Sequence, residues 1–215
     1  MKIGILWDLD GTLLDTLGDL TDATNYALAQ FGLPARTLAE IRSFVGNGAK
    51  NQIARAMGLE RDDPRVDPVL AVYKPYYDAH CQVKTAPYAG IYEALEQLKQ
   101  YPMAVVSNKP DSAVQALCRQ YFPGFYARGE RANCPRKPAP DMILRSMEDM
   151  GLDACIYVGD SEVDIRTANN ANVPCVSVLW GFRDREQLAE GQYFCETPAQ
   201  LPEIIEKIVG TYHGK

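Results

Sequence analysis

The stretch IGILWDLDGT (residues 3–12) is an apolar run that ends in two carboxylates one residue apart. Alternation along a strand places Asp8 and Asp10 on the same face, and Gly11 leaves the backbone free to turn away after them. Open parallel sheets bind their ligands at the carboxyl ends of the strands. The stretch therefore predicts a buried strand that brings a catalytic pair of carboxylates to a binding site.

The composition is that of an ordinary globular protein. The chain has 215 residues, of which 47% are hydrophobic and 23% are charged. These proportions are typical of a packed core with a polar surface. A chain of this length suits either one large domain or a core with a smaller inserted unit.

Charge and hydropathy exclude two classes of partner. With a net charge of -6, the chain lacks the excess of Lys and Arg on which affinity for nucleic-acid phosphates depends, although a small anionic substrate remains compatible with it. No apolar run approaches the roughly 20 residues of a membrane span, and the apolar start is too short for a signal peptide. We therefore expect a cytoplasmic protein that binds no nucleic acid and no membrane.

The cysteines also favour a cytoplasmic protein. There are six, widely scattered and without a C-x-x-C pair, so we expect reduced thiols that are mostly buried. They are Cys81, Cys118, Cys134, Cys155, Cys175 and Cys195.

Four short apolar runs predict buried parallel strands: 3–7, 103–106, 155–158 and 173–179. Helical patterns separate the later runs, and Asp111 and Pro140 are suited to begin two of these helices. This β-α-β alternation predicts an α/β fold with a Rossmann-like, doubly wound parallel sheet.

A long helical stretch lies between the first two predicted strands. Its apolar residues recur at helical spacing, and Thr37 and Glu40 have the spacing of a capping box. An elaborate crossover is the alternative, but four helices exceed what a crossover needs. The expected division is a helical cap domain, 15–87, inserted in a catalytic core formed by 1–14 and 88–215.

Polar side chains recur where the later predicted elements end. Ser107 and Asn108 follow the second strand, Lys137 lies in a loop before a helix, and Asp160 and Asp164 follow the third strand. Each has an ordinary structural alternative, namely a turn, a solvated charge, or a helix cap with an exposed residue one turn later. Together they would gather four carboxylates at one edge of the sheet, where the charges repel unless cations are present. Oxygen ligands without nearby His or Cys favour Mg²⁺ beside the lysine.

These motifs, in this order, resemble those of the haloacid dehalogenase superfamily of phosphohydrolases, whose first motif matches Asp8-Leu9-Asp10-Gly11-Thr12. The helical insert lies where that superfamily carries its cap, so the resemblance covers nearly the whole chain. A lone short motif is weak evidence, whereas four in order are specific.

The resemblance implies catalytic roles. Asp8 is expected to be the nucleophile that becomes an aspartyl phosphate, and Asp10 the general acid and then base. Ser107 and Asn108, with nearby backbone N–H groups, are expected to hold the phosphoryl oxygens, while Lys137 neutralises the charge shared by nucleophile and phosphate.

The resemblance also implies a metal site and a further substrate residue. Mg²⁺ is expected to be bound by Asp8, by the backbone carbonyl of Asp10 and by Asp160, with Asp164 acting at the metal's edge through water or by orienting its neighbours. Thr12 fits the phosphatase branches and is expected on the substrate side.

The loop VGNGAK (residues 45–50) lies between two predicted cap helices and is similar to the cap loop of phosphoglycolate phosphatases. Gly46 and Gly48 allow backbone donors to approach an anion, and Lys50 adds positive charge at a helix start. These three residues and Asn47 are the expected substrate contacts of the cap. The alternative is structural: Gly46 ends a helix, Gly48 permits a turn and Lys50 is solvated.

The sequence thus predicts a Mg²⁺-dependent phosphomonoester hydrolase that acts on a small phosphorylated metabolite and is most similar to 2-phosphoglycolate phosphatases. Pyrophosphate, a sugar phosphate or a nucleoside monophosphate are alternative substrates, because the core binds the phosphoryl group and the cap binds the rest. A phosphotransferase or mutase and a non-catalytic regulatory protein are more distant alternatives. A monomer and a homodimer both remain open.

Overall fold

Six parallel strands form the central sheet of the computed structural model, which describes residues 1–213. In order across the sheet they are β5 (Tyr126–Glu130), β4 (Met103–Pro110), β1 (Ile3–Trp7), β6 (Ala154–Gly159), β7 (Cys175–Val178) and β8 (Tyr193–Cys195). From β1 the chain passes to β4 on one side and later to β6 on the other. The crossovers therefore diverge at the carboxyl end of β1, the position at which open α/β sheets bind ligands.

Helices cover both faces of this sheet. On one face lie α5 (Ile91–Gln97), α6 (Asp111–Tyr121) and α9 (Leu201–His213), and on the other α7 (Asp141–Met150) and α8 (Glu162–Asn170). Successive residues of β1 serve different faces, since Ile5 and Trp7 belong to the first apolar cluster and Leu6 to the second. The predicted doubly wound α/β core is confirmed.

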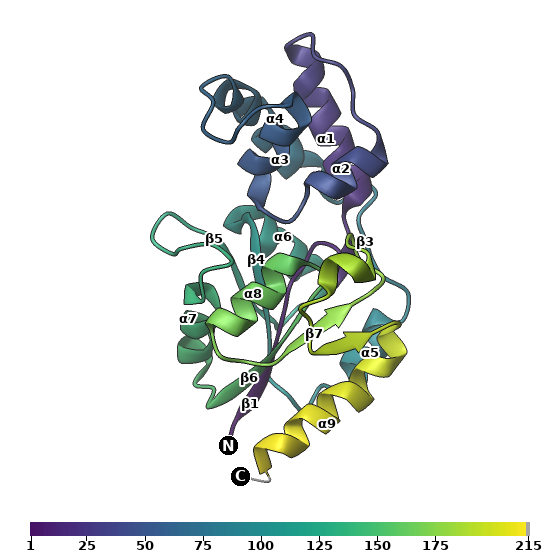
Figure 1. Cartoon of the computed structure of the whole chain (residues 1–215), viewed down its shortest axis with the longest axis vertical. Helices are drawn as coiled ribbons and strands as arrows, with labels where there is room; N and C mark the ends of the chain where they lie inside the picture. Colours follow the sequence, from purple (N-terminus) through teal and green to yellow (C-terminus); the bar gives the residue numbers. More distant parts are fainter. Residues whose placement is uncertain (214–215) are drawn as a thin grey trace.

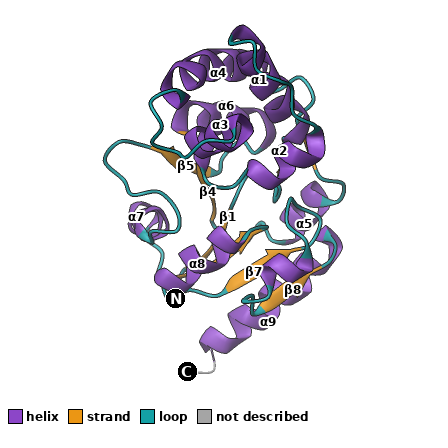
Figure 2. Ribbon diagram, turned by 45° about the horizontal axis from the view of Figure 1, so that its top comes forward, coloured by secondary structure: helices purple, strands orange, loops and turns teal. Residues whose placement is uncertain are grey.

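Four further helices lie beyond the carboxyl end of the sheet, away from both chain ends (Figures 1 and 2). They are α1 (Leu17–Gln30), α2 (Leu38–Phe44), α3 (Gly48–Met57) and α4 (Val66–His80). The predicted capping box at Thr37 and Glu40 begins α2. A short antiparallel ribbon, β2 (Leu14–Asp15) with β3 (Ala86–Pro87), joins these helices to the core.

Four strands of the structure are absent from the sequence prediction, and two others differ from it in length. The four are β5 and β8, the two edges of the central sheet, and β2 and β3 of the short ribbon. Strand β4 continues to Pro110, four residues beyond its apolar run, whereas β7 is shorter than expected. The extension of β4 matters most, because it holds Ser107, Asn108 and Lys109 in a buried strand rather than in a turn.

The six cysteines are free and buried, as expected. Among residues 1–213, no helix has both the length and the apolar character needed to cross a membrane.

Candidate active site

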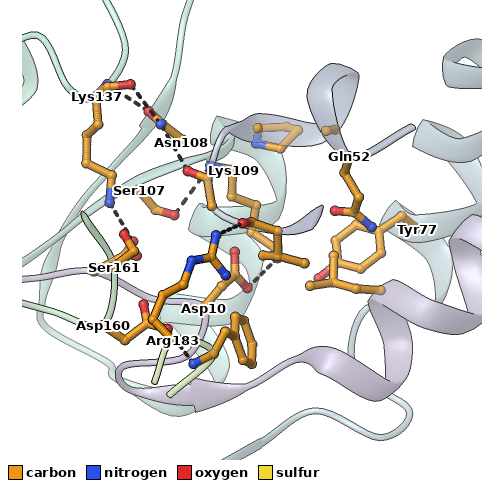
Figure 3. Close-up of a pocket in the computed structure, with 18 of the residues that line it drawn as sticks. Asp10, Gln52, Tyr77, Ser107, Asn108, Lys109, Lys137, Asp160, Ser161 and Arg183 are labelled. Carbon is orange, nitrogen blue, oxygen red and sulfur yellow. Dashed lines mark hydrogen bonds and ion pairs between the residues drawn. The ribbon is translucent and has the colours of Figure 1, made fainter. Parts of the chain in front are cut away.

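A pocket lies where the carboxyl ends of β1, β4 and β6 face the inserted helices (Figure 3). The core lines it with Asp8, Asp10, Ser107, Asn108, Lys109, Lys137, Asp160 and Arg183, among others. The inserted segment contributes Gly46, Gly48, Gln52, Tyr73 and Tyr77, among others. The structure thus brings together residues of all four sequence motifs and two glycines of the 45–50 loop.

Lys137 lies between two buried carboxylates. Its Nζ is 2.9 Å from Asp8 Oδ1 and 2.7 Å from Asp164 Oδ1, and it donates to the Tyr157 hydroxyl at 3.0 Å. Despite the ion pair, Asp8 Oδ1 accepts no well-aligned hydrogen bond. Among residues 1–213, this oxygen of the predicted nucleophile therefore has the Lys137 ammonium group as its polar partner and can accept from a further donor or cation.

Asn108 holds the backbone of Lys137. Its Oδ1 accepts the Lys137 N–H at 2.8 Å, and its Nδ2 donates to the Lys137 carbonyl at 3.0 Å. The same Nδ2 lies 3.5 Å from the carbonyl of Gly46 in the inserted segment. Because the amide is committed in this way, Asn108 positions the lysine and contacts the 45–50 loop, whereas the sequence suggested a phosphoryl contact.

Burial disfavours the charged form of two carboxyls. It raises the pKa of Asp8 to about 7, opposed by Lys137 and reinforced by Asp164 and Asp10. Burial, with the negative charges of Asp164 and Asp8, likewise raises the pKa of Asp160 well above its usual range. The single positive charge of Lys137 leaves this group of carboxyls undercompensated, so a further cation would stabilise their ionised forms.

The donor set fits a metal ion held by Asp8 and Asp160. Carboxylate oxygens of Asp8, Asp160 and Asp164 lie within 4.8 Å of one another. Asp160 Oδ2 accepts the N–H of Phe182 at 2.7 Å, which leaves Oδ1 for another partner. A Cβ at Gly11 or Gly181 would collide with Asp160, so two glycines are needed to admit this side chain.

Both carboxylate oxygens of Asp164 already accept hydrogen bonds within the protein. Oδ1 accepts from Lys137, and Oδ2 accepts from the N–H and hydroxyl of Ser161 at 3.0 and 2.6 Å in the capping box of α8. The side chain is fully buried, so the alternative of an exposed helix residue is wrong. Asp164 is arranged to orient Lys137 and to add negative charge near a metal.

Asp10 carries its own buried cation. Its Oδ1 accepts from Lys109 Nζ and from the Thr16 hydroxyl, each at 2.6 Å. Neither Lys109 nor Thr16 is among the residues that the sequence predicted for the site. Lys109 could have been found as the next residue after Ser107-Asn108 along the extended β4, whereas Thr16 follows a turn that the sequence does not position.

Three predicted substrate residues do not line this pocket. Thr12 is fully buried, and its carbonyl accepts the indole N–H of Trp180 at 3.0 Å. The Asn47 carbonyl accepts from Arg136 at 3.1 Å, which ties the loop to the core.

Lys50 is the clearest correction among them. Helix α3 begins at Gly48, and Gln52, four residues later, lies on the same face, while Lys50, two residues after Gly48, points elsewhere. Its Nζ pairs with Asp67 at 2.7 Å and lines a separate surface cleft. Lys50 therefore follows the alternative in which it does not face the substrate, except that its charge is paired with Asp67 rather than solvated.

Arg183 joins the core to the end of α2. Its guanidinium donates to the carbonyls of Arg42 at 3.1 Å and Val45 at 2.6 Å, and it pairs with Glu162 at 3.0 Å. Arg42 in turn donates to the Gly181 carbonyl at 3.1 Å. These bonds hold the 45–50 loop against the pocket.

Residues 5–178 match the haloacid dehalogenase-like hydrolase family. The chain belongs to this family. It is 34% identical over 223 residues to the phosphoglycolate phosphatase of Mesorhizobium japonicum, covering 96% of this chain and 97% of the relative. It is 32% identical over 215 residues to the N-acetylmuramic acid 6-phosphate phosphatase of Pseudomonas aeruginosa, covering 94% of each.

Among solved structures, the chain is similar to a proposed phosphoglycolate phosphatase from Lactobacillus delbrueckii subsp. bulgaricus. The TM-score is 0.86 at 38% identity, with 93% of this chain and 96% of that chain covered. The predicted family, its α/β fold and its class of enzyme, a phosphatase, are confirmed.

Proposed function

We propose that the protein is a Mg²⁺-dependent phosphatase that hydrolyses a short phosphomonoester, 2-phosphoglycolate or a close analogue, beneath a cap formed by α1 to α4. The observation that carries this proposal is the pocket in which Asp8, Asp10, Ser107 and Lys137 converge. The buried free cysteines further support action in a reducing compartment, the cytoplasm.

In the first step, a carboxylate oxygen of Asp8 attacks phosphorus in line as the bond to the leaving oxygen breaks, and Asp10 gives that oxygen a proton. Lys137 stays paired with Asp8 and neutralises the charge it shares with the phosphoryl group, while the Ser107 hydroxyl donates to a phosphoryl oxygen. Asp8 and Asp160 would hold Mg²⁺, which when bound would supply charge neutralisation at the phosphoryl group.

In the second step, water attacks the phosphorus of the aspartyl phosphate and Asp10 takes its proton. Phosphate leaves, and Asp8 is restored as a carboxylate. The Thr16 hydroxyl keeps Asp10 oriented, since it donates to Oδ1 at 2.6 Å. The cap excludes bulk water during both steps.

The walls of the pocket favour a short substrate, because Tyr73 and Tyr77 of the inserted segment line the same pocket as Asp8 and Asp10. The relatives named as phosphoglycolate phosphatases support the same choice.

N-Acetylmuramic acid 6-phosphate is a second candidate, because the Pseudomonas aeruginosa relative is named for it. Its amino sugar is much bulkier than glycolate and would have to lie beside the Tyr73 and Tyr77 side chains that line the pocket. We therefore rank it below a short phosphoester.

A substrate panel tests the proposal. We expect kcat/KM for 2-phosphoglycolate to exceed that for ethyl phosphate, pyrophosphate, a nucleoside monophosphate and N-acetylmuramic acid 6-phosphate by at least about tenfold each, because only the first is both short and carboxylated. Phosphate release with Mg²⁺ and with EDTA is the measurement. Highest activity on the amino sugar phosphate or on pyrophosphate would overturn the proposed substrate.

The bonds of Arg183 give a prediction about the cap. Arg183→Met removes two donors to the end of α2, so we expect KM for 2-phosphoglycolate to rise roughly tenfold with a smaller change in kcat, because a hydrogen bond to a charged group contributes about 1.5–3 kcal/mol. Steady-state kinetics measure both values. Arg166→Met, which alters an exposed pair with Glu190, is the control, and an unchanged KM in the Arg183 variant would show that these bonds do not hold the cap.

A further inference from the structure

The catalytic pocket contains two buried lysines, each paired with one of the two aspartates of the first motif. Lys137 pairs with Asp8, and Lys109 pairs with Asp10; Figure 3 labels both lysines and Asp10. Within residues 1–213, the only other cation that lines the pocket is Arg183. These three cations line one pocket, and the protein holds some of them with more contacts than others.

Two of the three are fully committed. Arg183 uses its guanidinium on Glu162 and on two carbonyls of the cap. Lys137 bridges Asp8 and Asp164, and its backbone is clamped on both sides by Asn108.

Lys109 is held less firmly. Among residues 1–213, its Nζ has one hydrogen-bond partner, Asp10 Oδ1 at 2.6 Å, and it lies 4.6 Å from the centre of the Tyr77 ring. Asp10 does not depend on it, because the Thr16 hydroxyl donates to the same oxygen. The flexible four-carbon stem of a lysine allows its ammonium group to change partner while the strand stays fixed.

The position of Lys109 places it on the leaving-group side of the reaction. Asp10 is the proton donor to the leaving oxygen, so its partner lies beside that oxygen and beyond the phosphoryl group. The remaining walls there come from the cap and include Tyr73, Tyr77 and Gln52. Gln52 Nε2 already donates to the Thr24 hydroxyl oxygen at 2.8 Å, and burial raises the pKa of both tyrosines, which keeps them neutral.

An anionic leaving group buried here needs a cation, since an uncompensated buried charge is strongly destabilising. We infer that Lys109 binds a carboxylate carried by the leaving group of the substrate, giving up its ion pair with Asp10 to do so. The substrate carboxylate replaces the Asp10 carboxylate at the Lys109 ammonium group. Asp10 keeps its hydrogen bond from the Thr16 hydroxyl and protonates the leaving oxygen. This inference rests on the proposed function and extends it to the residue that selects the substrate.

The test compares two alkyl phosphates that both require a proton at the leaving oxygen, 2-phosphoglycolate with the carboxylate and ethyl phosphate without it. In Lys109→Met the preference for 2-phosphoglycolate, as a ratio of kcat/KM values, is expected to fall at least about 30-fold, mainly through KM, because truncating one member of a buried charge pair has a large effect. Lys109→Arg keeps the charge and is expected to recover part of the preference. Lys99→Met, on an exposed lysine paired with Glu96, is the control and should match the wild type.

The outcomes separate the two proposals. If the wild type prefers 2-phosphoglycolate but Lys109→Met lowers kcat/KM for both esters equally, Lys109 only positions Asp10 and the inference is overturned while the proposed function stands. If the wild type shows no preference for the carboxylated ester, the proposed substrate is overturned, and the inference with it. An unfolded Lys109→Met protein, detected by its melting curve, leaves the comparison to Lys109→Arg and Lys109→Gln, where the loss of preference must follow the loss of charge.

Discussion

Asp8→Asn is expected to abolish phosphate release and at the same time to stabilise the metal-free protein at about pH 8. The amide cannot form an aspartyl phosphate, so kcat should fall by at least about 10⁴-fold, as happens when a nucleophile is removed. Stability should rise because burial raises the pKa of Asp8 to about 7, which means that the folded protein opposes its ionisation. Lys137 retains Asp164 as a partner after the substitution.

Phosphate release with Mg²⁺ and the melting temperature in EDTA measure the two effects. We expect an increase in melting temperature of about 5 °C, which corresponds to about 2 kcal/mol for a chain of this size. Asp62→Asn, at an exposed carboxylate, is the matched control and should change neither quantity. Residual activity near the wild-type level would refute the assignment of Asp8 as the nucleophile. A lower melting temperature would show that the ion pair of Asp8 with Lys137 outweighs the cost of burying the Asp8 charge.

The fold could be predicted to the extent that its strands are apolar. The central strands β1, β4, β6 and β7 are recognisable as runs of buried residues. Strand β5 was missed because its sequence, YARGE, contains two charged residues and a glycine. Both β5 and β8 are edge strands, and β8 has only three residues. Such strands are defined by pairing with a neighbour, which composition does not reveal.

The site could be predicted where its residues follow strand ends. Asp8, Asp10 and Asp160 line the pocket for this reason, and Ser107 lines it from within the last residues of β4. The functions of Asn108 and Lys109 could not be assigned in the same way, because each depends on a partner far along the chain. Asn108 contacts Lys137, and Lys109 contacts Asp10, 99 residues away.

The cap contacts were the least predictable part. The VGNGAK loop suggested that its charged residue faces the substrate, yet Lys50 pairs with Asp67 on α4. Tyr73 and Tyr77, which do line the pocket, lie on an amphipathic helix where aromatic residues also serve as core. Only the docking of the helices on the sheet distinguishes these roles.

The second large effect concerns Mg²⁺ and pH together. The folded pKa of Asp8, about 7, lies above its ordinary value of 3.8. A carboxyl with a raised pKa contributes its full stability below pH 3.8, and this contribution is lost as pH rises through about 7. The loss amounts to at most about 4 kcal/mol for a shift of this size. Burial also raises the pKa of Asp160, so its contribution to stability likewise falls as pH rises.

A divalent cation between Asp8 and Asp160 favours their ionised forms, so metal binding should reverse this loss. We expect about 5 mM Mg²⁺ to raise the melting temperature by roughly 5–10 °C at about pH 8 and by less than about 2 °C at about pH 5, where protons compete for the same oxygens. Melting curves with Mg²⁺ and with EDTA at both pH values measure the difference. In Asp8→Asn the Mg²⁺ effect at about pH 8 should shrink, because one ligand and one negative charge are gone. An equal Mg²⁺ effect at both pH values would mean that the metal does not bind at the raised-pKa carboxyls, and the acidic cluster of β1 and β6 would lose its assignment as the metal site.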